Sequence, residues 1–488
     1  MNNKFNKETL ADLTKLIQAL YLEDHIPWVV GYSGGKDSTA SLQLVWHAVS
    51  ALPEEQRRHK PIHVISTDTL VESPVVAAWV NLSLQRMREA ATQQGMPIEV
   101  HRLTPTLQNT FWVNLIGKGY PAPRATFRWC TSRLKIDPSN RFIRDVIGKH
   151  GETILVLGTR KAESTNRARV MNRYENMRVR NSLSPNASLP NSLVFSPIED
   201  WSNDAVWLYL MQIKNPWEHS NKDLLTMYRG ATADGECPLV VDTSTPSCGS
   251  SRFGCWVCTL VEQDKSMSAM IQNDEDKAWM TPLLDFRNEI GGMDKDRERR
   301  DFRRMGGQLK LHNDRLVHGP YTKSSREYWL RRILEVQQEI RINGPKEFSN
   351  IQLITNEELR EIRRIWVMEK HEFDDTLPSI YRSITGELFI YEKDVFGGPF
   401  GIDEWNSLKE LCGSDNLLFE MQSSLLDLEQ RTMILTLRRG ILDDLESQIR
   451  QCYYRDEQDA EAIAKNKANK LSAIQQGLFP HTISEGKL

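Results

Sequence analysis

Residues 29–39 (VVGYSGGKDST) join an apolar segment to a helical pattern through a glycine turn. The adjacent Gly34 and Gly35 permit positive φ and let backbone N–H groups approach an anion closely. The helix start adds free N–H donors and partial positive charge. This spacing is not the Gly-x4-Gly-Lys-Ser/Thr pattern of Walker ATPases. We expect a phosphate site here, and an ordinary strand–turn–helix corner is the competing interpretation. Its polar side chains would come from Ser33, Lys36, Asp37, Ser38 and Thr39.

Two aspartates stand where predicted strands end, next to the expected phosphates. Asp37 follows the glycine turn, and Asp68 lies near the end of the apolar segment 62–69. Carboxylate oxygens are ligands of Mg²⁺, which commonly accompanies bound phosphates. Both are therefore candidate metal or nucleotide contacts, although Asp37 alternatively serves to favour the first turn of its helix.

Four of the seven cysteines crowd into 22 residues rich in Gly, Ser, Thr and Pro. Seven cysteines in 488 residues do not make a disulfide framework. Spacings of 11, 7 and 3 residues suit a [4Fe–4S] cluster, and Cys-x2-Cys with outlying cysteines also suits structural zinc. The four candidates for metal ligands are Cys237, Cys248, Cys255 and Cys258.

Cys130 stands apart from this cluster and has three interpretations. It is a further metal ligand, which would leave Cys237 or Cys248 free. Alternatively it is a reactive, persulfide-carrying thiolate near Arg124, Arg128 and Arg133, or an inert buried thiol. Cys412 and Cys452 lie in helical patterns and are expected to be packing residues.

Strands that alternate with helices must position these residues. Apolar segments at 29–31, 62–69, 98–103 and 153–158 predict strands, and 8–22 and 74–92 predict helices. The pattern predicts an α/β fold with a doubly wound parallel sheet, whose site lies at the carboxyl ends of the strands. Residues 181–196 have loop composition, and 403–452 read as one long amphipathic helix or a helix pair.

Length and composition indicate a globular protein of two or three domains. With 40% hydrophobic and 26% charged residues, the chain shows neither a membrane-spanning run nor a signal peptide, so we expect a cytoplasmic location and no membrane partner. The predicted domains are a nucleotide domain at 1–229, a cysteine-rich segment at 230–280, and a basic, then helical region at 281–488.

Two stretches are basic although the net charge is −3. Residues 160–180 hold seven Lys/Arg against two Glu. Residues 297–332 hold eleven against four acidic residues, interleaved with aromatic side chains. Such runs are usually solvated helix faces, and they also suit a polyanion.

Several motifs resemble known families. Residues 33–38 (SGGKDS) resemble the PP-loop of ATP pyrophosphatases, which cleave ATP to AMP and pyrophosphate. Residues 197–207, 158–164 and 130–138 are similar to signatures of phosphoadenylylsulfate (PAPS) reductases. This implies an adenine nucleotide α-hydrolase fold that binds ATP with Mg²⁺, nucleotide contacts at Gly158 and Arg160, and catalytic roles for Lys36, Asp37, Cys130 and Arg160.

The iron–sulfur branch of that family carries a Cys-Cys pair and a later Cys-x2-Cys. Here Trp129 replaces the first cysteine of the pair, while Cys255 and Cys258 are present. The resemblance favours a [4Fe–4S] cluster over zinc, with Cys130 at a family ligand position. The missing ligand and the extra Cys237 and Cys248 argue against a plain sulfonucleotide reductase.

Residues 311–329 and the helical C-terminal region resemble the DndC family, sulfurtransferases of bacterial DNA phosphorothioation systems. This resemblance implies DNA as substrate, with sulfur replacing a non-bridging phosphate oxygen. It also implies a cysteine desulfurase as sulfur donor, other subunits of the modification complex as partners, and a DNA-facing basic segment at 297–332.

Two other functions stay open. A PAPS or APS reductase would release sulfite and leave the basic C-terminal half unexplained. A non-catalytic assembly subunit would use the glycine turn only to sense ATP and would show no turnover.

Overall fold

The computed structural model describes residues 7–186, 188–231, 253–292, 296–305, 307–370, 372, 374–391, 402–433, 440–451 and 454–475. The chain divides into two compact units. Unit 1 comprises Met1–Phe111, Pro123–Gly291 and Asn343–Ser349, and unit 2 comprises Trp112–Ala122, Gly292–Ile342 and Asn350–Leu488. None of the described helices has the length and apolar character needed to cross a membrane.

Unit 1 is built on a six-stranded sheet with the order β3-β2-β1-β4-β6-β5. Neighbouring strands are parallel from β3 to β6, and only β5 runs antiparallel. Strand order reverses between β1 and β4, which is where ligands bind in open α/β sheets. The strands are β1 (Trp28–Gly31), β2 (Ile62–Thr67), β3 (Ile98–Leu103), β4 (Thr153–Val156), β5 (Ser184–Pro185) and β6 (Ser192–Phe195).

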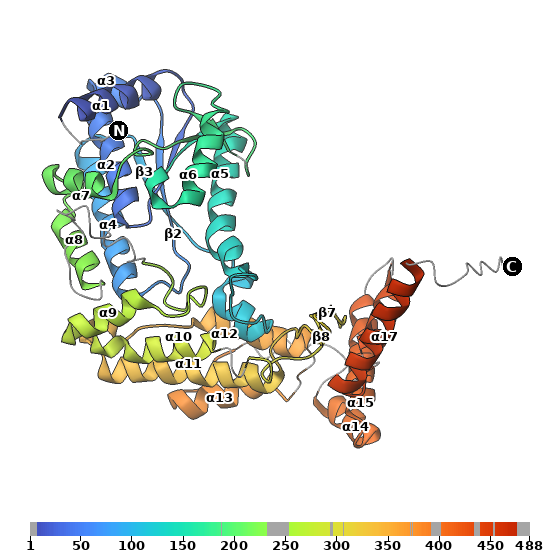
Figure 1. Ribbon diagram of the computed structural model, residues 1–488. Helices are drawn as coiled ribbons and strands as arrows, with labels where there is room; N and C mark the ends of the chain where they lie inside the picture. The colour runs from blue at the N-terminus through green and yellow to red at the C-terminus, as the bar shows by residue number, and fades with distance from the viewer. Residues whose placement is uncertain are drawn as a thin grey trace. The chain divides into compact units, whose positions relative to one another are not determined.

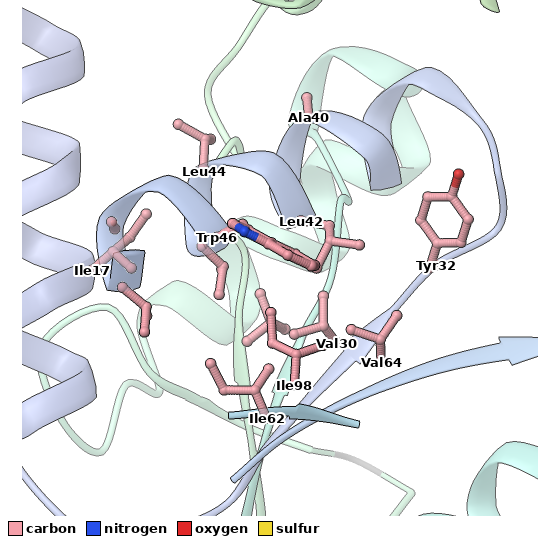
Figure 2. Packing of buried hydrophobic residues seen from close by; sticks show 14 of the residues in the cluster. Ile17, Val30, Tyr32, Ala40, Leu42, Leu44, Trp46, Ile62, Val64 and Ile98 are labelled. Carbon is pink, nitrogen blue, oxygen red and sulfur yellow. The ribbon is translucent and has the colours of Figure 1, made fainter. Parts of the chain in front are cut away.

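Alternation along the strands gives the sheet two apolar faces. Val30, Ile62, Val64 and Ile98 face one side, where they pack with Trp46 and other side chains of the covering helices (Figure 2). These helices are α1 (Lys7–Leu22), α2 (Lys36–Ser50), α4 (Pro74–Gln93), α7 (Asn203–Gln212) and α8 (Asn221–Gly230).

The opposite face of the sheet is covered by α5 (Asp137–His150), drawn across from α2 and α4 in Figure 1. Val29, Ile65 and Leu155 pack there against Ile143 and Val146 of this helix. The central strands β1 and β4 are buried on both faces and read as nearly continuous apolar runs, whereas β2 and β3 also carry polar side chains. Further α-helices in the described part of unit 1 are α3 (Glu54–Arg57), α6 (Thr165–Glu175), α9 (Lys265–Asn273) and α10 (Thr281–Gly291).

The predicted α/β fold with a mostly parallel sheet is confirmed. The loop prediction for 181–196 is wrong, because β5 and β6 lie within it and β6 pairs with β4. The polar Asn and Ser residues that suggested a loop surround a four-residue strand, Ser192–Phe195, which is too short to show a period.

Unit 2 consists mostly of helices, with a two-stranded hairpin of β7 (Leu311–His312) and β8 (Arg315–Leu316). Asn313 and Asp314 both have positive φ, as a tight hairpin turn requires. A hydrogen bond from the Trp112 indole to the Leu353 carbonyl (2.6 Å) links two chain segments within this unit. The α-helices in its described part are α11 (Lys323–Asn343), α12 (Asn356–Arg364), α13 (Thr376–Thr385), α14 (Ile402–Cys412), α15 (Asn416–Met433), α16 (Ile441–Gln451) and α17 (Glu457–Gln475).

Two expectations for the C-terminal half are corrected. The single helix or helix pair predicted at 403–452 is three helices, α14 to α16, in the described part of that range. Residues 296–305 form turns, so the arginines there do not line a helix face. Their side chains bond to carbonyls and acidic groups instead, as described below.

Candidate active site

The predicted phosphate loop connects β1 to the first turn of α2. Gly35 is the N-cap of α2, and Ser38 Oγ donates to the Gly35 carbonyl at 3.0 Å. The Ser33 N–H donates to Ser38 Oγ at 3.2 Å, which folds the loop over the helix N-terminus. The loop therefore has the N-terminal N–H groups and hydroxyls of an anion site.

Gly34 and Gly35 have different structural roles. Gly34 has a φ of +75°, and a Cβ there would lie 2.5 Å from Val80 Cγ2. Gly35 has an ordinary φ of −83°, and its Cβ would lie 3.2 Å from the Tyr228 hydroxyl. Conformation and space thus require glycine at Gly34, whereas at Gly35 only the space is tight.

The charged residues of the loop are joined to a buried arginine. Arg160, with a side chain only 4% exposed, donates from Nε to Asp37 Oδ1 at 2.7 Å. Lys36 Nζ lies 3.2 Å from the other oxygen of Asp37. A carboxylate held between two cations fixes both of them beside the phosphate loop. This arrangement supports a positioning role for Asp37, while its predicted contact with Mg²⁺ stays a prediction.

Gly158 brings the end of β4 against the phosphate loop. A Cβ at this position would lie 2.6 Å from the Asp37 carbonyl oxygen and 2.8 Å from the Ser38 nitrogen. Both contacts are to backbone and cannot be relieved by a side-chain rotation. Gly158 therefore permits the close approach that lets Arg160, two residues later, reach Asp37.

One cavity of about 580 Å³ lies at the carboxyl ends of β1, β2 and β4. Asp68 lies in its wall and forms an ion pair with Arg102, from the end of β3. The structure thus brings Asp68, Gly158 and the phosphate loop together as predicted for one sheet edge. Among its lining residues are Ser33, Asp37, Ser38, Asp68, Glu72, Arg102, Lys135, Gly158 and Phe253.

The Cys255–Cys258 turn docks on the loop that follows β2. The Trp256 N–H donates to the Val71 carbonyl at 3.0 Å. Cys255 Sγ lies 3.2 Å from the Thr69 hydroxyl and 3.7 Å from Glu72 Oε1. Because Glu72 also lines the cavity, Cys255 lies directly behind the cavity wall.

Lys135 places a positive charge near the cysteines. Sequence reasoning did not single out this lysine. It belongs to a π-helical turn, Thr131–Ile136, that begins directly after Cys130. Attraction to Cys255, and then to Glu72 and the other two thiols, raises the pKa of Lys135. π-Helical turns are frequent at functional sites, and this one places Cys130 and Lys135 at the same centre.

Burial is the largest influence on the pKa values of the Cys255 and Cys130 thiols. It raises the pKa of Cys255 to about 12, despite an opposing effect of Lys135, and it also raises the pKa of Cys130. Burial therefore opposes a thiolate at Cys130, and the reactive thiolate stays a prediction. Binding of a metal centre would displace these protons.

The described thiols do not form a preformed tetrahedral zinc site. In a zinc tetrahedron with Zn–S near 2.3 Å, sulfurs lie about 3.8 Å apart. Cys130, Cys255 and Cys258 do not all bring their sulfurs within 4.8 Å of one another. Cys237 and Cys248, the other predicted ligands, lie outside the described residues.

Arg287 of α10 orders the segment that follows this turn and was also missed. Its side chain is buried and donates to the carbonyls of Cys258 (2.9 Å), Glu262 (2.8 Å) and Val261. A single arginine in a helical pattern gives no sequence signal for such a role. Tyr228 is likewise a single residue in a helical pattern and was missed. Its hydroxyl accepts a hydrogen bond from the Lys36 N–H at 3.3 Å.

Most arginines of the predicted basic segment form ion pairs, hydrogen bonds or ring contacts within unit 2. Arg300 pairs with Asp296 at 2.9 Å, and Arg303 pairs with Asp301 at 2.9 Å. Arg299 stacks on the ring of Trp329, at 4.5 Å from its centroid. The local excess of positive charge is therefore smaller than the sequence indicates. Lys310, Arg315 and Arg331 are exposed.

Comparison with known proteins shows a domain family that part of the chain resembles. Residues 27–260 match the phosphoadenosine phosphosulfate reductase domain. An uncharacterised protein of Methanocaldococcus jannaschii is 26% identical over 253 residues, 52% of this chain and 40% of that protein. The chain thus matches less than half of the length of this relative.

Two solved structures resemble part of the chain. One is a PAPS reductase from Candida auris in a phosphate complex, with 13% identity and a TM-score of 0.27, covering 45% of this chain and 92% of that one. The other is the U34-tRNA thiolase NcsA from Methanococcus maripaludis with its [4Fe–4S] cluster. It has 15% identity and a TM-score of 0.28, and covers 46% of this chain and 73% of that one.

Proposed function

We propose that this protein, whose residues 27–260 match the PAPS reductase domain, is an ATP-dependent sulfurtransferase that modifies DNA phosphates. The observation that carries the proposal is the shared cavity. Its wall contains the phosphate loop at Ser33 and Ser38. It also contains Glu72, which lies 3.7 Å from Cys255 Sγ, and Lys135, which lies 3.8 Å from Glu72. A phosphate activated at the loop would therefore meet sulfur held at the cysteines without leaving the site.

The first step is adenylation of a phosphate oxygen. A non-bridging oxygen of the DNA backbone attacks the α-phosphorus of ATP, and the bond to the β-phosphate breaks to release pyrophosphate. The loop N–H groups and Lys36 stabilise the charge on the departing pyrophosphate. Arg160 holds Asp37 and thereby the start of α2 in place. Mg²⁺, held with the phosphates near Asp68, would share that charge.

In the second step, sulfur at the oxidation level of hydrosulfide attacks the activated DNA phosphorus. The bond to the AMP oxygen breaks, and AMP leaves with the original phosphate oxygen. The product is a phosphorothioate diester, and no net redox change occurs. A cysteine desulfurase with a thiol reductant is the expected class of sulfur source.

A [4Fe–4S] cluster fits the cysteine centre and would be held by Cys255, Cys258 and Cys130, completed by Cys237 or Cys248. When bound, it would supply an iron site for sulfur where the incoming hydrosulfide displaces one of the four cysteine ligands. Lys135 contributes positive charge beside the thiolates. Arg287 keeps the segment after Cys258 ordered through its three carbonyl bonds.

The test is a reaction of anaerobically prepared protein with ATP, sulfide and duplex DNA. We expect DNA-stimulated pyrophosphate release and a phosphorothioate linkage, detected by mass spectrometry of nuclease digests. A Cys255→Ser variant should lose the linkage, and Cys412→Ser, in α14 of unit 2, is the matched control. No phosphorothioate from folded, iron-loaded wild type and its partner subunits would contradict the proposal.

A sulfonucleotide reductase is the second candidate, because residues 27–260 match the PAPS reductase domain. PAPS or APS would then occupy the same cavity and yield sulfite. The same preparation supplied with PAPS or APS and a thiol reductant distinguishes the two, since only the reductase releases sulfite and needs no DNA.

A further inference from the structure

Three metal-ligating side chains converge on the α5-covered face of the sheet. His63 lies on β2, and Glu99 and His101 lie on β3. His63 pairs in register with Glu99, and His101 lies two residues further along β3, so all three project from the same face. The edge strand and its neighbour therefore hold these donors on a rigid frame.

The distances between the donor atoms match a tetrahedral ion. His63 Nδ1 lies 3.2 Å from His101 Nε2 and 3.3 Å from Glu99 Oε2. Glu99 Oε2 lies 3.6 Å from His101 Nε2. With Zn–N and Zn–O bonds of about 2.0–2.2 Å, tetrahedral geometry places ligand atoms about 3.3–3.5 Å apart. A hydrogen bond between the two imidazoles accounts for only one of these three short distances, whereas a bound metal ion would account for all three.

Burial around the two histidines favours their neutral form, whereas the Glu99 side of the site is open to solvent. Burial lowers the pKa of His63 and of His101, and the positive charge of Arg88 adds to this effect at His101. The Phe142 ring of α5 covers both imidazoles, with centroids 5.6 and 4.6 Å away. The Glu99 side chain is 62% exposed, which leaves an entry path and room for water as a fourth ligand.

We propose that His63, Glu99 and His101 bind a divalent transition-metal ion of the zinc class. Two imidazoles and one carboxylate favour Zn²⁺, Co²⁺ or Ni²⁺ over Mg²⁺ and Ca²⁺, which prefer all-oxygen sites. This set is distinct from the cysteine centre. Among the described residues it is the only group of three such donors within 4.8 Å of one another.

The ion would have a structural rather than catalytic effect on the proposed reaction. His63 is four residues before Thr67, which lines the cavity, so about 13 Å of strand separates the two. An ion held by β2 and β3 would fasten the edge strand β3 to the sheet. Arg102, which pairs with Asp68 in the cavity wall, directly follows His101 on that strand.

The experiment is a Co²⁺ titration of iron–sulfur-loaded protein, in which the cluster occupies the cysteines. We expect one equivalent with d–d absorption and no thiolate-to-cobalt charge transfer, displaced by Zn²⁺ and not by Mg²⁺. The double variant His63→Gln/His101→Gln should lose this equivalent. The variant His150→Gln is the matched control, because this neighbouring histidine of α5 is outside the donor set.

Glu99→Gln tests the site without disturbing buried groups, because Glu99 is exposed. We expect at least tenfold weaker Co²⁺ binding and an unchanged circular dichroism spectrum. Equal stoichiometry and affinity in wild type, Glu99→Gln and the double variant would overturn the proposal. A charge-transfer band on the bound equivalent would also overturn it, since it would place the ion on thiols. Neither result depends on sulfur transfer.

Discussion

Arg160 donates from Nε to Asp37 Oδ1 at 2.7 Å and so ties the segment after β4 to the first turn of α2. The same guanidinium donates to the Trp201 carbonyl at 3.2 Å, which adds the segment before α7. Three segments far apart in the sequence thus meet at one buried side chain. The charge of Arg160 is compensated by Asp37, which supports a positioning role for this arginine.

The first prediction concerns this ion pair. Arg160→Gln removes one partner of a largely buried pair and should lower the free energy of unfolding by about 3 kcal/mol. Arg160→Lys keeps the charge but not the forked donors, so it should retain the fold and lose pyrophosphate release at least tenfold. Urea unfolding and a pyrophosphate assay measure the two effects. Wild-type turnover in Arg160→Lys would contradict a role in positioning.

The second prediction separates the two glycine requirements of the phosphate loop. Gly34→Ala places a Cβ 2.5 Å from Val80 at a φ of +75°, which costs about 1–2 kcal/mol in backbone strain alone. It should abolish ATP binding, as measured by calorimetry. Adding Val80→Ala removes the steric overlap and leaves the strain, so it should restore binding only in part. Full recovery in the double variant would show that strain at Gly34 does not matter.

The sequence was sufficient to predict what depends on periodicity and on short motifs. The strand β3 was predicted at its observed bounds. The phosphate loop, Asp68 and Gly158 were predicted to lie at one edge of the sheet, and all three line the same cavity. The sequence was insufficient where a single side chain contacts a residue far away in the sequence. Arg102, Glu72 and Arg287 look like ordinary surface charges until the fold brings them to the cavity or the cysteines. Burial of Cys130 likewise depends on packing that no spacing encodes.

The third prediction concerns the protonation of Cys255 in the metal-free protein. Its folded pKa, near 12, lies above the ordinary value of 9.0, so the folded state holds this proton more tightly than the unfolded state. The associated contribution to stability is present below pH 9 and is lost as pH rises toward 12. Unfolding midpoints measured across this range should therefore fall more steeply in wild type than in Cys255→Ser.

Two neighbours should shift that thiol in opposite directions. Lys135 lowers the pKa of Cys255 and Glu72 raises it. Alkylation by iodoacetamide at a fixed pH should therefore be slower in Lys135→Met and faster in Glu72→Gln than in wild type. Equal rates in both variants would show that access, and not charge, controls the reactivity of Cys255.

The fourth prediction is that iron binding depends on Cys255 and Cys258 and on the arginine behind them. Cys255→Ser and Cys258→Ser should lose most of the iron and acid-labile sulfide. Arg287→Lys should bind the cluster but lose it faster in air, because one ammonium cannot satisfy three carbonyls. Arg341→Lys is its control, since Arg341 donates to the Ile351 carbonyl within unit 2. Absence of iron and acid-labile sulfide from the anaerobically purified wild type would contradict the cluster.

The fifth prediction concerns DNA binding by unit 2. Arg300 and Arg303 are paired with aspartates, so replacing them would test folding and not DNA contact. Lys310, Arg315 and Arg331 are exposed, and changing all three to Ala should weaken binding evenly across DNA sequences. By counterion release, the slope of log K against log salt should flatten by about 1 for each lost phosphate contact. Lys149, Lys214 and Lys222 provide a control triple of exposed lysines in unit 1 that do not line the cavity at the strand ends. If both triple variants bound DNA like wild type at every salt concentration, alone and with partner subunits, these unit 2 cations would be solvated surface charges.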